Sequence, residues 1–222
     1  MEKEKQNQEL IILLLFVLLF VTVGFLFLRN SFLSGEISKV EKRSEEALAR
    51  ISDNSVIEPV DKLSDPFRGN EQAENKFYVY SSFSCSHCSS YSLEIKKLLE
   101  KNGDKVKVIW KDAVSNDDFI GEKAALAARC AQQQGKFWEY HDLLFANQNK
   151  LTDQDLIDHA KTIGLNEIDF KSCVSLKKTA TIIQASQNEA VAVGVDGTPY
   201  TVVNGQRLSG VYLYEQLKEL LK

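Results

Sequence analysis

Two cysteines three positions apart, Cys85 and Cys88, are the residues of this sequence whose types and spacing best suit chemistry. They follow a strand-like run at 77–80 and precede a helix-like run that ends at Leu98 and Leu99. Two thiols at such a junction can close a small disulfide and open it again, and the N–H groups at a helix start favour a thiolate over a thiol. The pattern therefore predicts redox chemistry, with Cys85 as the nucleophile and Cys88 as the resolving thiol.

Length and composition narrow the class of protein. The chain has 222 residues, enough for one ordinary domain with attached segments. Its 44% hydrophobic and 26% charged residues are normal for a globular protein. A net charge of −4 and the scarcity of basic runs argue against nucleic acid as the main partner.

An apolar segment at 10–28 precedes all four cysteines. As a helix it would be about 28 Å long at ~1.5 Å per residue, enough to cross the core of a bilayer. The alternatives are a cleaved signal peptide and a buried core helix, but residues 29–35 (RNSFLSG) hold no Ala-x-Ala-like site and no lipid-accepting cysteine. We therefore expect an uncleaved anchor at 10–28 with a cytoplasmic head at 1–9. Basic residues nearly balance across the span, so the outward orientation is inferred from the cysteines, whose disulfide chemistry belongs in an oxidising compartment.

Residues 29–69 are expected to form a stalk and a linker. The segment 36–51 is charged, with apolar residues at spacings of three and four, which indicates a single solvated helix or a weak coiled coil. Periodicity is lost after it, where Pro59 and Pro66 lie. We expect this linker to hold the following domain clear of the membrane.

Residues 70–222 are expected to form an α/β domain. The helix at 89–102 should bury Leu93 beside Leu98, and the last helix of a helical insertion at about 117–194 is expected at 177–193. The predicted architecture is β-α-β with a right-handed crossover, the insertion, then β-β-α. The expected strands lie at 77–81, 106–110, 200–203 and 206–209, the last two joined by an Asn204-Gly205 hairpin.

A Thr-Pro pair, Thr198 and Pro199, directly precedes the third expected strand. Proline suits a strand start because it has no N–H for the ladder. In the predicted order of elements, this loop can face the start of the first helix. We expect a cis bond between Thr198 and Pro199, because the isomer costs only ~0.5–1 kcal/mol and tertiary contacts can select it; an ordinary trans turn proline is the alternative.

Four segments resemble the DsbA-like thioredoxin-fold oxidoreductases of bacteria. They are 65–70 (DPFRGN), 83–88 (FSCSHC), 134–141 (QGKFWEYH) and 194–199 (GVDGTP), in the family's order. The resemblance implies a thioredoxin-like fold with a helical insertion, a nucleophile at Cys85, a resolving thiol at Cys88 and a substrate-binding cis-proline loop at Thr198 and Pro199. It also implies that an anchored member acts on exported proteins and exchanges electrons with a quinone-linked membrane partner. We expect no cofactor and no metal.

Two positions depart from the family pattern. Ser86 stands where the family usually has proline, and its hydroxyl can hydrogen-bond the thiolate. Val79 stands six residues before Cys85, where many relatives keep a glutamate beneath the active site. The proton of Cys88 must then pass through water or another group, and Lys111 is a candidate neighbour.

His87 lies inside the motif and resembles the histidine of the oxidising members. An imidazolium there would lower the pKa of Cys85. A shift from ~8.5 to ~5.5 would favour the reduced form by about 2 kcal/mol at neutral pH, or roughly 45 mV toward an oxidising potential. The alternative is an exposed histidine with no electrostatic role.

The other two cysteines, Cys130 and Cys173, both lie in the expected helical insertion. We expect a structural disulfide worth about 2–4 kcal/mol. Two buried free thiols are the alternative, and a four-cysteine zinc site is a third. His141 and His159 lie in helical segments and are expected to be capped or surface residues rather than ligands.

Together these features predict an extracytoplasmic, single-pass membrane oxidoreductase that donates its Cys85–Cys88 disulfide to exported proteins. Two alternatives stay open. One is a disulfide reductase or isomerase of the same fold, and the other is a redox-inert binding domain.

Overall fold

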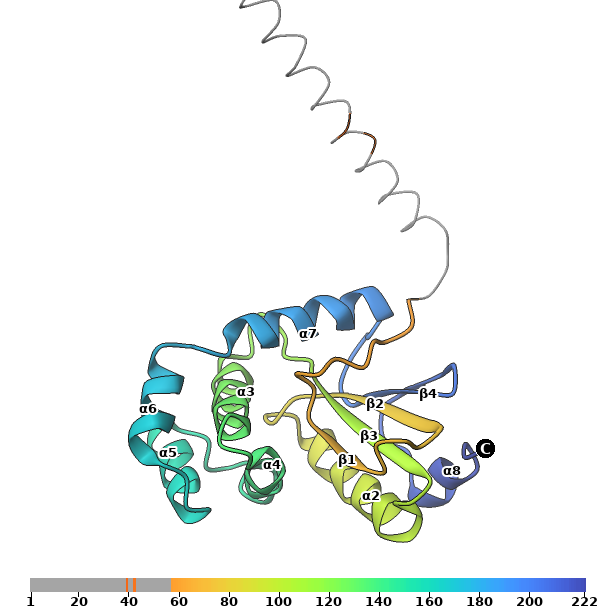
Figure 1. Cartoon of the computed structure of the whole chain (residues 1–222), viewed down its shortest axis with the longest axis horizontal. Coiled ribbons are helices and arrows are strands. Elements are labelled where there is room, and N and C mark those ends of the chain that lie inside the picture. Colours follow the sequence, from red (N-terminus) through yellow and green to blue (C-terminus); the bar gives the residue numbers. More distant parts are fainter. Residues whose placement is uncertain (1–38, 40–41, 43–56) are drawn as a thin grey trace, which may run out of the picture. The chain divides into compact units, whose positions relative to one another are not determined.

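The computed structural model describes residues 39, 42 and 57–222 (Figure 1). Within these residues, no helix is both long enough and apolar enough to cross a membrane. The predicted anchor at 10–28, the head at 1–9 and most of the expected stalk lie outside the described residues.

A five-stranded sheet, in the order β1-β3-β2-β4-β5, forms the centre of the domain. The central strand β2 pairs in parallel with β3, and the other pairs are antiparallel. The parallel pair and the terminal hairpin confirm the predicted topology. The strands are β1 (Phe67–Gly69), β2 (Asn75–Ser81), β3 (Val106–Asp112), β4 (Tyr200–Val203) and β5 (Gln206–Ser209).

Helices cover both faces of the sheet, and the insertion between β3 and β4 holds α7 (Ala180–Val193) and four further helices (Figure 1). On one face α2 (Ser86–Asn102) and α8 (Tyr214–Lys218) bury Leu98 and Leu217 against the strands. On the other face α7 buries Ala190 and Val193 against Tyr80. The other insertion helices are α3 (Phe119–Gln132), α4 (Phe137–Ala146), α5 (Asp153–Thr162) and α6 (Glu167–Ser175).

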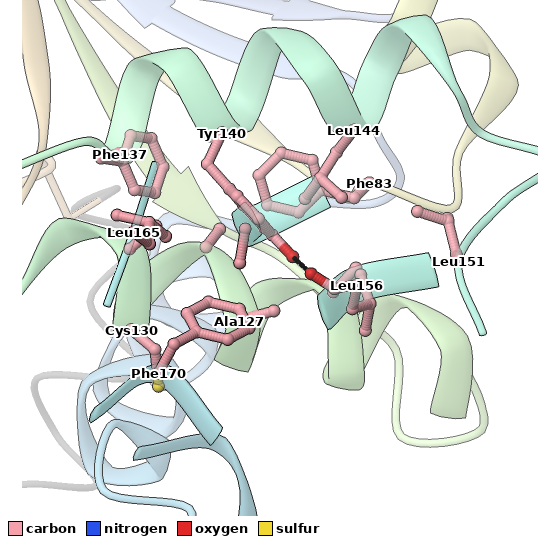
Figure 2. Packing of buried hydrophobic residues seen from close by; sticks show 14 of the residues in the cluster. Phe83, Ala127, Cys130, Phe137, Tyr140, Leu144, Leu151, Leu156, Leu165 and Phe170 are labelled. Carbon is pink, nitrogen blue, oxygen red and sulfur yellow. Dashed lines mark hydrogen bonds between the residues drawn. The ribbon is translucent and has the colours of Figure 1, made fainter. Parts of the chain in front are cut away.

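The insertion has a core of its own that reaches the cysteine motif. Tyr140 on α4 is fully buried and donates a hydrogen bond of 2.7 Å to the carbonyl oxygen of Leu156 on α5 (Figure 2). The same cluster of buried side chains includes Phe83 and Cys88. The helical insertion therefore packs directly behind the redox pair.

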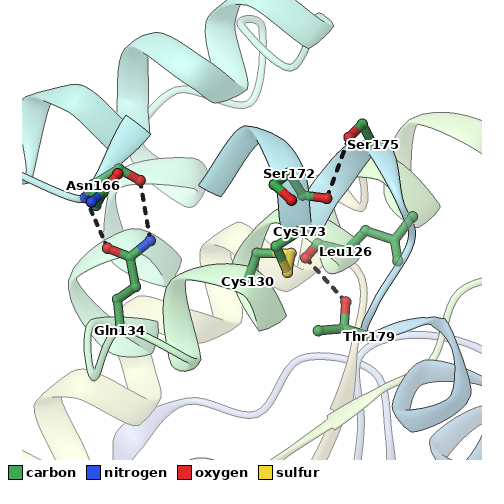
Figure 3. The surroundings of a disulfide bond; sticks show 8 residues. All are labelled: Leu126, Cys130, Gln134, Asn166, Ser172, Cys173, Ser175 and Thr179. Carbon is green, nitrogen blue, oxygen red and sulfur yellow. Dashed lines mark hydrogen bonds between the residues drawn. A yellow bond between two sulfur atoms is a disulfide. The ribbon is translucent and has the colours of Figure 1, made fainter. Parts of the chain in front are cut away.

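A disulfide joins Cys130 on α3 to Cys173 on α6, with Cα atoms 5.8 Å apart (Figure 3). Beside it, the Gln134 side chain both donates to and accepts from the backbone of Asn166, at 3.3 and 2.8 Å. These two links hold the end of α3 against the start and the body of α6.

We expect that replacing Cys130 and Cys173 together with alanine will lower the free energy of unfolding by about 2–4 kcal/mol, because the unfolded chain loses a closed loop. Denaturant unfolding of the full chain measures this difference. Disulfide exchange at Cys85 should continue at its normal rate in the folded variant. An unchanged midpoint of denaturant unfolding would contradict a stabilising role of the disulfide.

Residues 57–66 pack on the domain, so the expected boundary at residue 70 is too late. Asp65 is buried and forms an ion pair of 2.6 Å with Lys111, whose Nζ also donates to the carbonyl oxygen of Val60. Arg129 donates to the carbonyl oxygen of Ser64 at 2.8 Å. Two buried cations thus anchor a segment that has no helix or strand periodicity, which explains why the pattern indicated a linker.

Three helix predictions also need correction. The helix α2 begins at Ser86 rather than 89, and Leu93 is 65% exposed because the buried positions fall at 88, 91, 95 and 98. The helix α7 begins at Ala180 rather than 177, since Lys177 has a φ of +47°. The spacing of four leucines, at 213, 217, 220 and 221, predicts one final amphipathic helix, but α8 ends at Lys218, before Leu220 and Leu221.

Candidate active site

Cys85 caps the N-terminus of α2, directly beyond the end of the central strand. Its Sγ accepts a hydrogen bond of 3.2 Å from the backbone N–H of Cys88, one turn into the helix. Cys85 is half-buried, whereas Cys88 is only 1% exposed. Both are free thiols in this structure. The geometry gives an accessible sulfur at the helix start and a buried sulfur behind it.

The loop with Thr198 and Pro199 lies against Cys85, as the order of elements predicted. The strand β4 runs antiparallel to β2, with Tyr200 paired to Tyr80, so the residues before β4 reach the end of β2. The bond between Thr198 and Pro199 is cis, the expected isomer. Sγ of Cys85 lies 3.4 Å from the Thr198 carbonyl oxygen, to which the protonated thiol donates. A polypeptide bonded to Cys85 would therefore lie beside this loop.

The two cysteines have opposite pKa shifts. A hydrogen bond from Cys88 is the largest cause that lowers the pKa of Cys85, to about 5, and bonds from Thr198 and from the backbone N–H groups of Cys88 and His87 act in the same direction against burial. The same bond with Cys85, together with burial, raises the pKa of Cys88. At neutral pH Cys85 is a thiolate and Cys88 a thiol, as a nucleophile and a resolving residue require.

We expect the alkylation rate of Cys85 to rise with pH around a midpoint of about 5 and to be constant near neutrality. The measurement is the rate of iodoacetamide labelling of the reduced full chain across pH. Cys88→Ala should move the midpoint upward, because it removes the main hydrogen bond to the thiolate. A midpoint of about 8.5, the value of a free thiol, would contradict the stabilised thiolate.

Ser86 and His87 lie in the first turn of α2 with exposed side chains. Within the described part of the chain, neither side chain makes a hydrogen bond, and the contribution of His87 to the Cys85 thiolate comes from its backbone N–H. A role of the Ser86 hydroxyl or the His87 imidazole in tuning Cys85 stays a prediction.

Lys111 is not the neighbour of Cys88 that the sequence analysis expected. Val79 and Trp110 line a small cavity with Cys88, whereas Lys111 follows Trp110 in β3 and therefore points to the opposite face of the sheet. There it is fully buried between the carboxylates of Asp65 and Glu189, at 2.6 and 2.7 Å. Lys111 stabilises the packing of the N-terminal segment and cannot reach the redox pair.

A groove of about 690 Å³ opens beside Cys85. One wall is the loop after β3, and the other is α7, which contributes Gln184, Gln187 and Asn188. Ser84 and Asp118, joined by a short hydrogen bond, lie at its Cys85 end. The polar side chains that line the groove can hydrogen-bond a peptide backbone.

Two features of the site were not predicted from the sequence: the polar wall that α7 contributes to the groove, and Gln148, which positions the backbone beside Cys85. The helical spacing of Gln184, Gln187 and Asn188 was the available signal for a polar face on α7. Gln148, in the loop after α4, donates from Nε2 to the carbonyl oxygens of Phe83 and Cys85 at 2.8 and 2.9 Å. No sequence pattern points to this contact, which joins residues more than sixty positions apart.

Comparisons with known proteins agree with this geometry. A family model described as thioredoxin matches residues 61–222. The chain is 33% identical over 160 residues to the Na(+)/H(+) antiporter NhaA 3 of Salinispora tropica, covering 72% of this chain and 24% of that protein. It is 30% identical over 154 residues to NhaA of Herminiimonas arsenicoxydans, covering 69% and 24%. The chain thus spans about a quarter of the length of these curated relatives.

Solved structures of similar fold carry oxidoreductase names. The thiol-disulfide exchange protein alpha-DsbA2 of Wolbachia pipientis has a TM-score of 0.63 at 26% identity, with 71% of this chain and 86% of that chain covered. A thioredoxin-like oxidoreductase of Silicibacter pomeroyi has a TM-score of 0.66 at 22% identity, covering 72% and 91%, and shows the fold alone. BdbD of Bacillus subtilis also shows the fold, with a TM-score of 0.61 at 20% identity, covering 70% and 90%. This chain belongs to the thioredoxin family, and its fold is similar to that of the DsbA-type thiol-disulfide exchange protein of Wolbachia pipientis.

Proposed function

We propose that this chain is a thiol-disulfide oxidoreductase that works as a dithiol oxidase, outside the cytoplasm of a bacterium, and donates its Cys85–Cys88 disulfide to exported proteins. The observation that carries the direction is the stabilised Cys85 thiolate. A thiolate held by hydrogen bonds from Cys88, Thr198 and two backbone N–H groups favours the reduced form of the pair. A pair whose reduced form is favoured is a strong oxidant.

The reaction transfers two electrons from the substrate to the pair. A substrate thiolate attacks Sγ of Cys85, the bond between the two cysteines breaks, and its electron pair goes to the sulfur of Cys88, which takes a proton. A second substrate thiolate then attacks the substrate sulfur of the mixed disulfide. The substrate disulfide forms, and Cys85 leaves as its stabilised thiolate. The cis loop at Thr198 and Pro199 and the groove along α7 hold the substrate backbone during both steps.

The location and the partner are part of the proposal. The predicted span at 10–28 would anchor the chain in the membrane, and a structural disulfide between Cys130 and Cys173 suits an oxidising compartment. The reduced pair would be reoxidised by a quinone-linked membrane partner, so that electrons from exported proteins reach the respiratory lipid pool.

The test is thiol trapping of the full chain in intact bacteria that produce it. Acid quenching followed by alkylation should find the Cys85–Cys88 pair mainly oxidised, and a Cys88→Ala chain should be trapped in mixed disulfides with exported proteins. A pair that is mainly reduced at steady state would favour the reductase. An absence of mixed disulfides would favour a redox-inert domain.

A further inference from the structure

The buried resolving thiol needs a proton acceptor. Cys88 is 1% exposed, and burial contributes to raising its pKa, so it is a thiol when it must attack the mixed disulfide on Cys85. Water reaches it poorly. Val79 carries no ionisable group, and Lys111 lies on the opposite face of the sheet.

His141 shares a cavity with Cys88. The cavity has a volume of about 20 Å³, enough for one water molecule, and lies behind the redox pair between α2, α4 and the sheet. Its ionisable lining residues are Cys88, His141 and Tyr91. Tyr91 is excluded as the acceptor because it is neutral and its hydroxyl is hydrogen-bonded to Thr201 at 2.9 Å. His141, expected from the sequence to be capped or superficial, is only 6% exposed.

The imidazole of His141 is held in one orientation. Its Nδ1 lies 2.8 Å from Oδ1 of Asp142, and Asp142 accepts two hydrogen bonds from Arg68 at 3.0 and 2.7 Å. Five aromatic rings surround the imidazole with centroids 4.8 to 6.0 Å away: Phe83, Trp110, Phe137, Trp138 and Phe145. A ring that donates from Nδ1 to Asp142 leaves the lone pair of Nε2 on its other side, free to accept a proton in the cavity that His141 lines. Within the described residues, Nε2 makes no hydrogen bond of its own.

Resting on the proposed function, we propose that His141 is the proton acceptor for Cys88, held in its productive tautomer by Asp142 and Arg68. As the sulfur of Cys88 attacks Sγ of Cys85, its proton goes to Nε2 of His141, directly or through one water. The disulfide forms, the bond from Cys85 to the substrate breaks, and the substrate sulfur leaves with the electron pair. The imidazolium, beside the Asp142 carboxylate, then returns its proton to solvent. The reverse path supplies the proton when Cys88 is the leaving thiolate.

The charges around the ring suit this role. Arg68 on β1 and Asp142 on α4 are the charged groups that face His141, and α2 contributes only the neutral Cys88 and Tyr91. Trp110 is the residue of β3 that faces it, and Phe83 follows β2. Burial lowers the pKa of His141, so the imidazole is neutral near pH 7 and its free nitrogen can accept a proton.

The test measures the rate at which Cys88 attacks a mixed disulfide on Cys85, separately from the reaction of Cys85 itself. The reduced full chain, kept in detergent, is mixed with the aromatic disulfide dithiobis-nitrobenzoate. Cys85 releases the first coloured thiolate in a phase that depends on reagent concentration, and Cys88 releases the second in a unimolecular phase. We expect His141→Gln to slow the second phase by about 10²-fold near neutral pH and to leave the first phase unchanged. The wild-type rate should level off above mildly acidic pH, whereas the variant rate should rise with hydroxide.

His159→Gln is the matched control, since His159 is also buried but hydrogen-bonds the Lys150 carbonyl at 3.0 Å, away from the cavity. Asp142→Asn is the second variant. Asp142 is partly exposed, so the substitution should be tolerated, and without the carboxylate the His141 ring is no longer held in the tautomer with its proton on Nδ1. This variant should slow the second phase by roughly tenfold or more. A second phase that is equal in rate and pH profile in all four proteins would overturn the role of His141. Loss of the first phase in the wild type would instead contradict the proposed function.

Discussion

Replacing Cys85 with serine is expected to abolish disulfide transfer by the full chain, so that oxidation of a reduced, unfolded substrate protein falls to the uncatalysed rate. The sulfur of Cys85 is the atom at which the disulfide is attacked and from which the mixed disulfide is released. A serine oxygen cannot form either bond. Cys88 cannot replace it, because that thiol is only 1% exposed and its burial disfavours the thiolate. The measurement is the loss of substrate thiols over time.

Two comparisons make the result specific. Ser86→Ala changes an exposed neighbour in the same turn of α2 and should retain turnover. Cys88→Ala keeps the nucleophile, so the chain should bind substrate covalently at Cys85 yet supply no disulfide of its own. Substantial turnover by the Cys85→Ser chain would refute the assignment of the nucleophile.

The second large effect concerns stability. Replacing Asp112 with alanine is expected to lower the free energy of unfolding by about 3–5 kcal/mol, because it leaves the Arg129 guanidinium buried and unpaired. Both side chains are fully buried, and Arg129 Nε lies 2.7 Å from Asp112 Oδ2. Asp112 also accepts from the indole N–H of Trp110 at 2.8 Å. Urea unfolding followed by tryptophan fluorescence reports on this domain, since both tryptophans of the chain, Trp110 and Trp138, lie in it.

A surface pair provides the contrast. Lys171 and Glu167 on α6 are half-exposed and 3.3 Å apart, so Glu167→Gln should change stability by no more than about 0.5 kcal/mol. The double change Asp112→Leu with Arg129→Met removes both charges and should cost less than Asp112→Ala alone. Equal decreases in the free energy of unfolding for Asp112→Ala and Glu167→Gln would show that the buried pair is not needed for the fold.

The topology could be predicted from local signals. The Asn204-Gly205 turn predicted the hairpin of β4 and β5, and both strands have the predicted bounds. The Cys-x-x-Cys motif after a buried strand predicted the strand-to-helix junction. The strand β1 could not be found, because three residues carry no periodicity and its pairing with β3 is a tertiary contact.

The buried polar groups were the least predictable part. Lys111 and Arg129 look like surface residues in the sequence, and their burial depends on partners far along the chain. His141 did carry a signal. It lies on one helical stripe with Phe137, Tyr140 and Leu144, all buried, and that spacing indicates an inward-facing position. The contact with Asp142 that orients it required the structure.

The reduction potential of the Cys85–Cys88 pair tests the central claim most directly. The full chain is equilibrated in detergent with glutathione mixtures, and the oxidised fraction is measured by alkylation. A stabilised Cys85 thiolate predicts a potential more oxidising than about −180 mV, toward the value of about −120 mV found for a strong dithiol oxidase. A potential near about −270 mV, typical of a thioredoxin reductant, would contradict the oxidase and leave a reductase of the same fold.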